Sequence, residues 1–179
     1  MGSLRRTLDG LYLAGGVLGA VALAAIALLI LGNVLGRQLG LVVPSADDLT
    51  AFAVAGSAIL PLAYAFRHGA HIRVDLFIGR LRGRARTAIE VLVLAIACAM
   101  VGFFAYATFD QMTDSYEFEE VSQGMLGIPL WIPQLALPFG AGLFAIALLD
   151  DLVAVLCGRR PSYRRAEDAA ALERAAGEL

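Results

Sequence analysis

Four long apolar stretches constrain this chain more than any other feature of its sequence. They cover approximately residues 11–35, 49–66, 87–109 and 131–157. A transmembrane helix needs about 20 consecutive apolar residues, within a range of roughly 17–25. The second stretch is the shortest, yet at about 1.5 Å per residue it still reaches about 27 Å. We therefore expect an all-α integral membrane protein with four transmembrane helices, in which residues 1–179 form a single membrane domain.

The composition supports this fold class. Of the 179 residues, 59% are hydrophobic and only 17% are charged, whereas soluble domains average about 45–50% apolar and about 25% charged residues. This argues against a soluble enzyme, a disordered chain and a disulfide-rich secreted module. The first stretch is longer than the roughly 7–15 residues of a signal-peptide core, so we expect it to be retained as a span. Pro133 and Pro138 predict a short first turn or a kink at the start of the fourth span.

The arginines predict the orientation. All 14 basic residues are arginines, and all except Arg37 lie before the first span, in the loop 67–86 or in the tail 159–179. Basic loops stay on the cytoplasmic side of a membrane, so both termini are predicted to be cytoplasmic. The loop 110–128 is acidic and is predicted to lie outside, with Tyr116 and Trp131 in an outer aromatic belt. The net charge of −2 implies no nucleic-acid partner.

The basic inner loop carries a helical pattern of its own. Val74, Phe77, Ile78 and Leu81 recur at the spacing of one helix face, while Arg73, Arg80 and Arg84 fall together on another face. This pattern predicts a short amphipathic helix on the inner leaflet, between the second and third spans, with its arginines at the phospholipid phosphates.

Two polar groups at span ends have both a structural and a functional interpretation. Ser45 to Asp48 resembles a capping box that begins the second span, with its acids at the positive end of the helix; alternatively, it is a docking point for a periplasmic partner. His68 and His71 could bind a metal or haem, but zinc would lack a third ligand. Polar residues at the membrane interface are the better interpretation of the two histidines.

Three acids lie within or beside the apolar stretches. Glu90 follows Arg86 by four residues, and the Asp150–Asp151 pair precedes the Arg159–Arg160 pair by about two turns. Acids inside a membrane are functional candidates, but all three lie near the predicted cytoplasmic end. Neutralisation by these arginines is therefore at least as good an interpretation as ion transport.

Small residues suggest close helix contacts. Gly15 and Gly19 form a GxxxG pair in the first span, and Gly32, Gly36 and Gly40 continue the spacing. Such residues let two helices approach closely, and the glycine faces are one candidate surface for a partner subunit. Asn33 can hydrogen-bond to a neighbouring helix.

The sequence contains no recognisable catalytic or transport core. There is no GxSxG, HExxH or phosphate-binding loop, and the discontinuous helices and inverted repeats of transporter cores are missing. We expect no enzyme activity, no cofactor, and no metal or substrate site in this chain. A four-span chain without a mid-membrane polar site is better explained as a supporting subunit than as a carrier.

Three blocks of residues resemble a known family. They are Asn33-Val-Leu-Gly-Arg37, followed by the acidic pair Asp47-Asp48; Arg67-His-Gly-Ala-His71-Ile-Arg-Val-Asp75; and Ile128-Pro-Leu-Trp131-Ile-Pro. Over about residues 15–158 the chain resembles the small membrane subunit, of the DctQ type, of TRAP (tripartite ATP-independent periplasmic) transporters. The chain departs from the family pattern at Thr50, Ala51 and Phe52, where the family often has an aromatic residue and an arginine.

The resemblance implies a function in the bacterial inner membrane. Such a subunit pairs with a large membrane subunit, which moves its substrate by a sodium-driven elevator motion, and a soluble periplasmic protein captures the substrate, typically an organic acid. The small subunit is expected to brace the large one and to help the loaded binding protein dock. The residues expected at partner or lipid interfaces are Asn33, Arg37, Asp47, Asp48, Arg67, His71, Arg73, Asp75, Arg80, Arg84 and Trp131.

Two other functions are compatible with the sequence. One is a membrane anchor subunit of a redox enzyme that holds haem or quinone, with His68 or His71 as a ligand. The other is an independent four-helix carrier, which would transport substrate without a second subunit.

Overall fold

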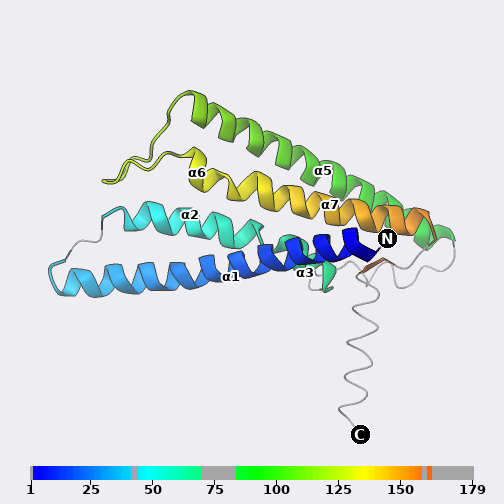
Figure 1. Ribbon diagram of the computed structural model, residues 1–179, viewed down its shortest axis with the longest axis horizontal. Coiled ribbons are helices and arrows are strands. Elements are labelled where there is room, and N and C mark those ends of the chain that lie inside the picture. The colour runs from blue at the N-terminus through cyan, green and yellow to red at the C-terminus, as the bar shows by residue number, and fades with distance from the viewer. Residues whose placement is uncertain (1, 42–43, 70–83, 159–160, 163–179) are drawn as a thin grey trace, which may run out of the picture.

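The computed structural model describes residues 2–41, 44–69, 84–158 and 161–162, and its regular elements are helices (Figure 1). They are α1 (Gly2–Gln38), α2 (Ala46–Ile59), α3 (Leu62–Arg67), α5 (Arg84–Glu117), α6 (Trp131–Gln134) and α7 (Ala136–Leu156). Within these described ranges, four segments are long and apolar enough to cross a membrane: Arg6–Gln38, Ala46–Arg67, Arg86–Glu117 and Trp131–Leu156. This agrees with the expected all-α membrane fold. The predicted amphipathic helix at 74–81 and the tail 163–179 lie outside the described residues.

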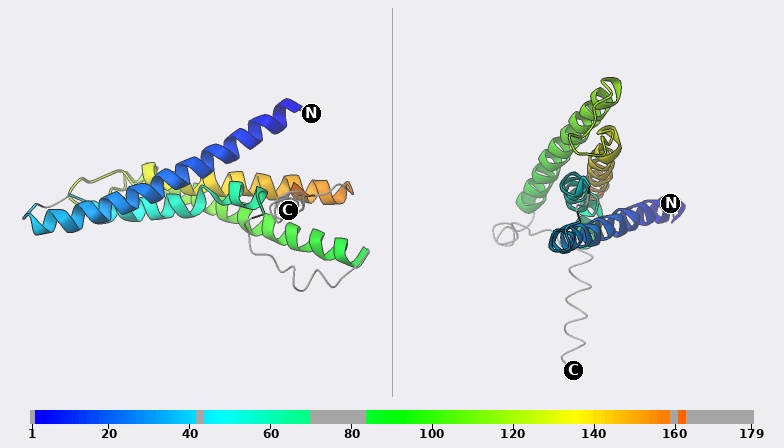
Figure 2. Two further views of the ribbon diagram at one scale, coloured as in Figure 1. Left: turned by 90° about the horizontal axis from the view of Figure 1, so that it is seen from below. Right: turned by 90° about the vertical axis from the view of Figure 1, so that its left-hand side faces the viewer.

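The helices form an open array. α1 packs against α2 and α3, α5 packs against α7, and α7 also contacts α2 and α3. Helices α1 and α5 consequently lie on opposite sides of the central helices α2 and α7 (Figure 2). Only 11% of the most apolar window of α1 and 6% of that of α5 are buried, against 39% for the window in α7. The two outer helices therefore present long apolar surfaces to their surroundings.

The second span is broken near its end. The sequence predicts one helix over residues 49–66, but α2 ends at Ile59 and α3 begins at Leu62. Pro61 lies at the break; proline has no backbone N–H, and its ring clashes with the carbonyl of the residue four positions earlier. The N–H of Ala65 donates to Pro61 O at 2.9 Å, so the helix restarts immediately after the break.

The third helix is longer than predicted. It continues past residue 109 to Glu117, so the first part of the expected outer loop 110–128 is helical. The segment contains no glycine or proline, and the chain turns only at Glu119, which has a positive φ of 51°. There the N–H of Glu120 donates to Ser115 O at 3.0 Å, a bond typical of a helix C-terminus. The predicted first turn of the fourth span is confirmed, because α6 is a separate short helix that meets α7 at Leu135.

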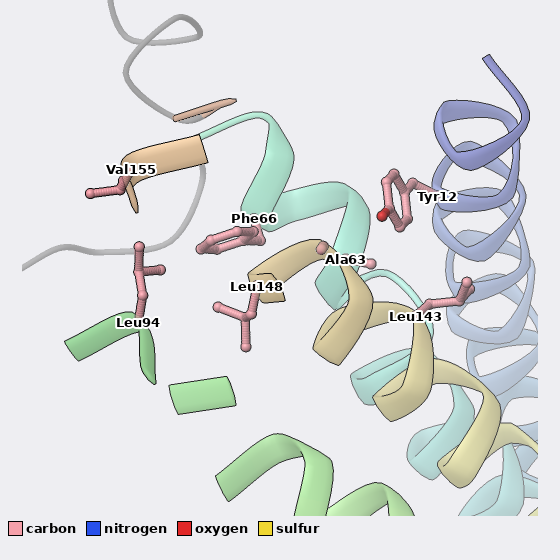
Figure 3. Close-up of a cluster of buried hydrophobic side chains, with 8 residues drawn as sticks. Tyr12, Ala63, Phe66, Leu94, Leu143, Leu148 and Val155 are labelled. Atoms are coloured by element: carbon pink, nitrogen blue, oxygen red, sulfur yellow. The ribbon is translucent and has the colours of Figure 1, made fainter. Parts of the chain in front are cut away.

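The glycines of α1 lie against the break in the second span. A side chain at Gly15 would come within 2.7 Å of Leu60 O, and one at Gly19 within 2.7 Å of the Pro61 ring. The Gly15–Gly19 pair is thus used inside the chain and does not meet a partner subunit, whereas a Cβ at Gly32 would meet nothing within 4 Å. The core lies next to this contact (Figure 3): Tyr12 reaches from α1 toward α3, and Phe66 lies near α7 and α5.

Candidate functional site

The predicted polar residues gather at the two ends of the bundle. One end, here the Arg67 end, contains the start of α1, α3, the start of α5 and the end of α7 (Figure 1). The other, the Ser45 end, contains the end of α1, the start of α2, the connection between α5 and α6, and α6 itself.

At the Arg67 end, one arginine joins three helices. Arg67 donates from Nη1 to Asp150 Oδ2 at 2.6 Å and from Nη2 to Asp9 Oδ1 at 2.9 Å. Its guanidinium carbon also lies 5.2 Å from the centre of the Tyr12 ring, within the range of a cation–π interaction. The Arg67 side chain is only 10% exposed. These four residues, Asp9, Tyr12, Arg67 and Asp150, are called the Arg67 cluster below; they tie α1 and α7 to α3.

The two neighbouring acids of α7 have different partners. Asp150 pairs with Arg67, which is 83 positions away in the sequence. Asp151 is 1% exposed and accepts two hydrogen bonds from Ser162, from its N–H at 2.9 Å and from its hydroxyl at 2.6 Å. The expected neutralisation by the Arg159–Arg160 pair falls outside the described residues.

One acid of α5, Glu90, has the partner that its spacing predicted. Arg86 Nε lies 3.7 Å from Glu90 Oε1, so the predicted neutralisation of Glu90 by Arg86 is confirmed.

A pocket of about 510 Å³ opens beside the Arg67 cluster. Its walls are Asp9, Tyr12, Leu13, Tyr64, Arg67, His68 and Ser162. His68 places Nδ1 2.9 Å from Tyr64 O and stacks on the Tyr64 ring, with 4.0 Å between the ring centroids. The Tyr12 hydroxyl is buried and has no hydrogen-bond partner within the described part of the chain.

At the Ser45 end, the predicted capping box is absent. Ser45 precedes α2 with a positive φ of 51° and makes no side-chain cap bond. Its hydroxyl instead accepts a hydrogen bond at 3.0 Å from the N–H of Leu126, which lies in the connection between α5 and α6. The left-handed backbone turns the hydroxyl away from the first turn of α2, so the serine joins two segments that are distant in the sequence.

A second pocket, of about 380 Å³, lies at the Ser45 end. It is lined by Asn33, Arg37, Ser45, Ala46, Asp47, Asp48, Gly124 and Met125. The first sequence block, Asn33 to Arg37, and the acidic pair that follows it therefore meet in space. Asp47 is exposed, and Oδ2 of Asp48 is buried without a hydrogen-bond partner among the described residues. Two carboxylates at the N-terminus of a helix, beside one exposed arginine, form a polar surface that can receive a charged partner.

The aromatic residues predicted for the outer belt also meet. The rings of Tyr116 and Trp131 stand edge to face, 5.7 Å apart at an interplanar angle of 89°. They link the end of α5 to the start of α6 at the Ser45 end.

The other expected interface residues are placed only in part. Arg84 is the first residue of α5, whereas His71, Arg73, Asp75 and Arg80 lie outside the described residues. Reasoning from the sequence missed Asp9 and Tyr12 as neighbours of Arg67. In the sequence, the only sign that these two residues take part in a polar contact is that both are polar and lie at the edge of the first apolar stretch.

A comparison with known protein families assigns the chain to one of them. Residues 26–158 match the family described as "Tripartite ATP-independent periplasmic transporters, DctQ component". No curated protein matches the chain. The family match includes Arg37, Asp48, Arg67, Asp150 and Trp131, and it spans more than half of the 179 residues. It favours a transporter subunit over the redox-anchor alternative. With its four long apolar helices, the chain belongs to the DctQ family, the small membrane subunits of TRAP transporters.

Proposed function

We propose that this subunit is a non-catalytic brace for the large, elevator-type subunit of a TRAP transporter. The complex takes up an organic acid across the bacterial inner membrane, driven by sodium and supplied by a periplasmic binding protein. The observation that carries the brace is the Arg67 cluster, in which one arginine holds two carboxylates on different helices.

A brace must keep its shape while its partner moves. The ion pairs of Arg67 connect α1 to α7 through α3, and the Gly15 and Gly19 contacts keep α1 close to the α2–α3 break. Meanwhile the apolar sides of α1 and α5 remain open. These sides are long enough to contact a large membrane subunit on one side and lipid on the other.

The test is an assembly and transport assay on the whole complex. Tagged wild-type chain, extracted in mild detergent, is expected to bring down a much larger polytopic protein in stoichiometric amount. Asp150→Asn is expected to lower the recovery of the complex, since Arg67 then loses one of its two charged partners. Complex that does form should keep its sodium dependence in proteoliposomes. Intact complex that has lost sodium dependence would show that the chain couples the ion directly and would end the brace proposal.

The Ser45 end fits the docking of the binding protein. Asp47 and Asp48 stand at the N-terminus of α2, beside Arg37, in an open pocket. Asp47 is exposed and attracts a basic partner surface, and exposed charges act mainly on the rate of encounter. In this proposal the Ser45 end faces the periplasm.

Neutralising Asp47 tests the docking role. In a reconstituted transporter, Asp47→Asn is expected to raise the KM for the loaded binding protein several-fold and to leave kcat and complex recovery unchanged, because exposed charges steer association. The matched control is Asp110→Asn, an exposed acid within α5. Equal KM values for the two variants and the wild type would refute the docking role.

The orientation follows from the arginines. We propose that both termini and the segment 67–86 are cytoplasmic, and that Arg73, Arg80 and Arg84 contact phospholipid phosphates. Alkaline phosphatase fused to the C-terminus is expected to be inactive, because the enzyme works only after export. An active fusion would reverse the orientation and, with it, the side assigned to each pocket.

A further inference from the structure

The pocket beside the Arg67 cluster contains a polar group that the brace does not use. Tyr12 is 2% exposed, and its hydroxyl is buried without a hydrogen-bond partner among the described residues. Buried polar groups in proteins are nearly always satisfied. Tyr12 belongs to the wall of the 510 Å³ pocket, so a ligand in the pocket can supply the missing partner.

The other residues that line the pocket offer both hydrogen-bond donors and an acceptor. A guanidinium has five N–H groups, and Arg67 uses Nη1 and Nη2 for its two carboxylates. Asp9 is 54% exposed, so its carboxylate can accept from a further cation. Donors suit a phosphate, and the exposed carboxylate suits an ammonium group.

The charge of the pocket selects between headgroups. Among the residues that line the pocket, Asp9 and Arg67 carry one charge of each sign, and Asp150, which is paired with Arg67, adds a second negative charge. A purely anionic headgroup would meet this excess negative charge, whereas a zwitterionic headgroup adds an ammonium group that offsets it.

An apolar path leads away from the pocket along α1. Leu13 lines the pocket, and Val17 and Val21 follow it at intervals of four residues, so the three share one helix face. Their exposed fractions are 52%, 54% and 60%. An acyl chain can lie along this face while its headgroup occupies the pocket.

We propose that this pocket binds one phospholipid with a primary ammonium group, phosphatidylethanolamine. Its phosphate lies at Tyr12 and Arg67, its ammonium group at Asp9, and an acyl chain along Leu13, Val17 and Val21. The site rests on the membrane placement of the chain and is independent of whether the subunit braces its partner.

The test uses the whole transporter complex in nanodiscs with equal amounts of phosphatidylethanolamine and phosphatidylglycerol. Photoactivatable analogues of the two lipids are compared, and labelled peptides are mapped by mass spectrometry. The peptide containing Leu13 and Val17 should take up the phosphatidylethanolamine probe about fivefold more than the other probe, the ratio expected for one net hydrogen bond. Tyr12→Phe keeps the ring and should lower this labelling about fivefold.

Three further arms sharpen the result. Tyr106→Phe is the matched control, since Tyr106 is a 66% exposed tyrosine on α5, and it should leave the labelling unchanged. Asp9→Asn should reduce the preference for phosphatidylethanolamine, because the ammonium group loses its acceptor. Soluble glycerophosphoethanolamine should not displace the lipid probe, because it has no acyl chain.

Each opposite result would overturn the proposed lipid site. Equal labelling by both lipids removes the selectivity, and unchanged labelling in Tyr12→Phe removes the role of the hydroxyl. Displacement by glycerophosphoethanolamine would make the pocket a site for a soluble phosphoester, and a cross-link from Asp9 to the large subunit would make it a protein contact. In every arm, recovery of the complex is scored separately, so a failed lipid site leaves the proposed brace standing.

Discussion

The two ends of the bundle use their charges in opposite ways. At the Arg67 end, a nearly buried arginine holds the acids of two other helices, and Asp151 is buried with Ser162. At the Ser45 end, Asp47 and Arg37 are exposed, and in the described part of the chain no ion pair joins them. Here the link between distant segments is neutral, from the Leu126 N–H to the Ser45 hydroxyl.

The difference is between charges that stabilise the subunit itself and charges that are available to a partner. Breaking a buried charge pair leaves an uncompensated charge and is strongly destabilising, whereas exposed charges contribute little to stability. The charges at the Arg67 end therefore stabilise the fold of the subunit. Charge at the Ser45 end remains free for a partner.

Arg67→Ala is expected to have the largest effect on stability. It removes the centre of the cluster and should lower the free energy of unfolding by about 3 kcal/mol, as expected for the loss of two hydrogen bonds between charged groups. Thermal unfolding of the purified complex measures the change. Arg37→Ala, at the other end, is the control and should stay within about 0.5 kcal/mol of the wild type, as for most surface substitutions. Equal losses for the two variants would abolish the distinction between the ends.

The glycine contact near the Arg67 end gives the next largest effect. Gly19→Leu should destabilise the subunit by about 2 kcal/mol, as is typical of overpacking, because a side chain there collides with the Pro61 ring. The control is Gly32→Leu in the same helix, where a Cβ meets nothing within 4 Å. A tolerated Gly19→Leu would mean that α1 is free to move away from the break, and the Arg67 cluster would then be the main tie between the two segments.

The smallest expected stability effect is at the Ser45 end. Ser45→Ala should cost about 1 kcal/mol, the usual net value of one hydrogen bond. Hydrogen exchange shows which bond was lost: the Leu126 amide should exchange faster, and the amides of Asp47 and Asp48 should not change. Faster exchange confined to the first turn of α2 would restore the capping interpretation for Ser45.

Local patterns in the sequence predicted much of this protein. Membrane helices depend on the summed hydrophobicity of consecutive residues, so the apolar stretches predicted where the long helices lie. The positions of the prolines predicted the separate turn of α6, and the spacing of four residues between Arg86 and Glu90 predicted their ion pair. The family resemblance likewise depended on short blocks such as Asn33 to Arg37, and the family match bears it out.

Other features needed the packed chain. The sequence offered Asp150 a nearby basic pair, but its partner is Arg67 on another helix. Ser45 has the spacing of a cap, but its backbone conformation directs it to Leu126. In each case several partners were chemically acceptable, and only the relative placement of helices selected one.

By itself, then, the sequence determined that this chain crosses the membrane as four apolar segments and belongs with the small TRAP subunits, because hydrophobicity and motif spacing are properties of neighbouring residues. Only the tertiary structure decided that α1 seats its glycines on the Pro61 break and that Asp9 and Asp150 converge on Arg67. The physical reason is that an ion pair or a close helix contact depends on distances between segments far apart in the sequence, and those distances exist only after the helices have packed.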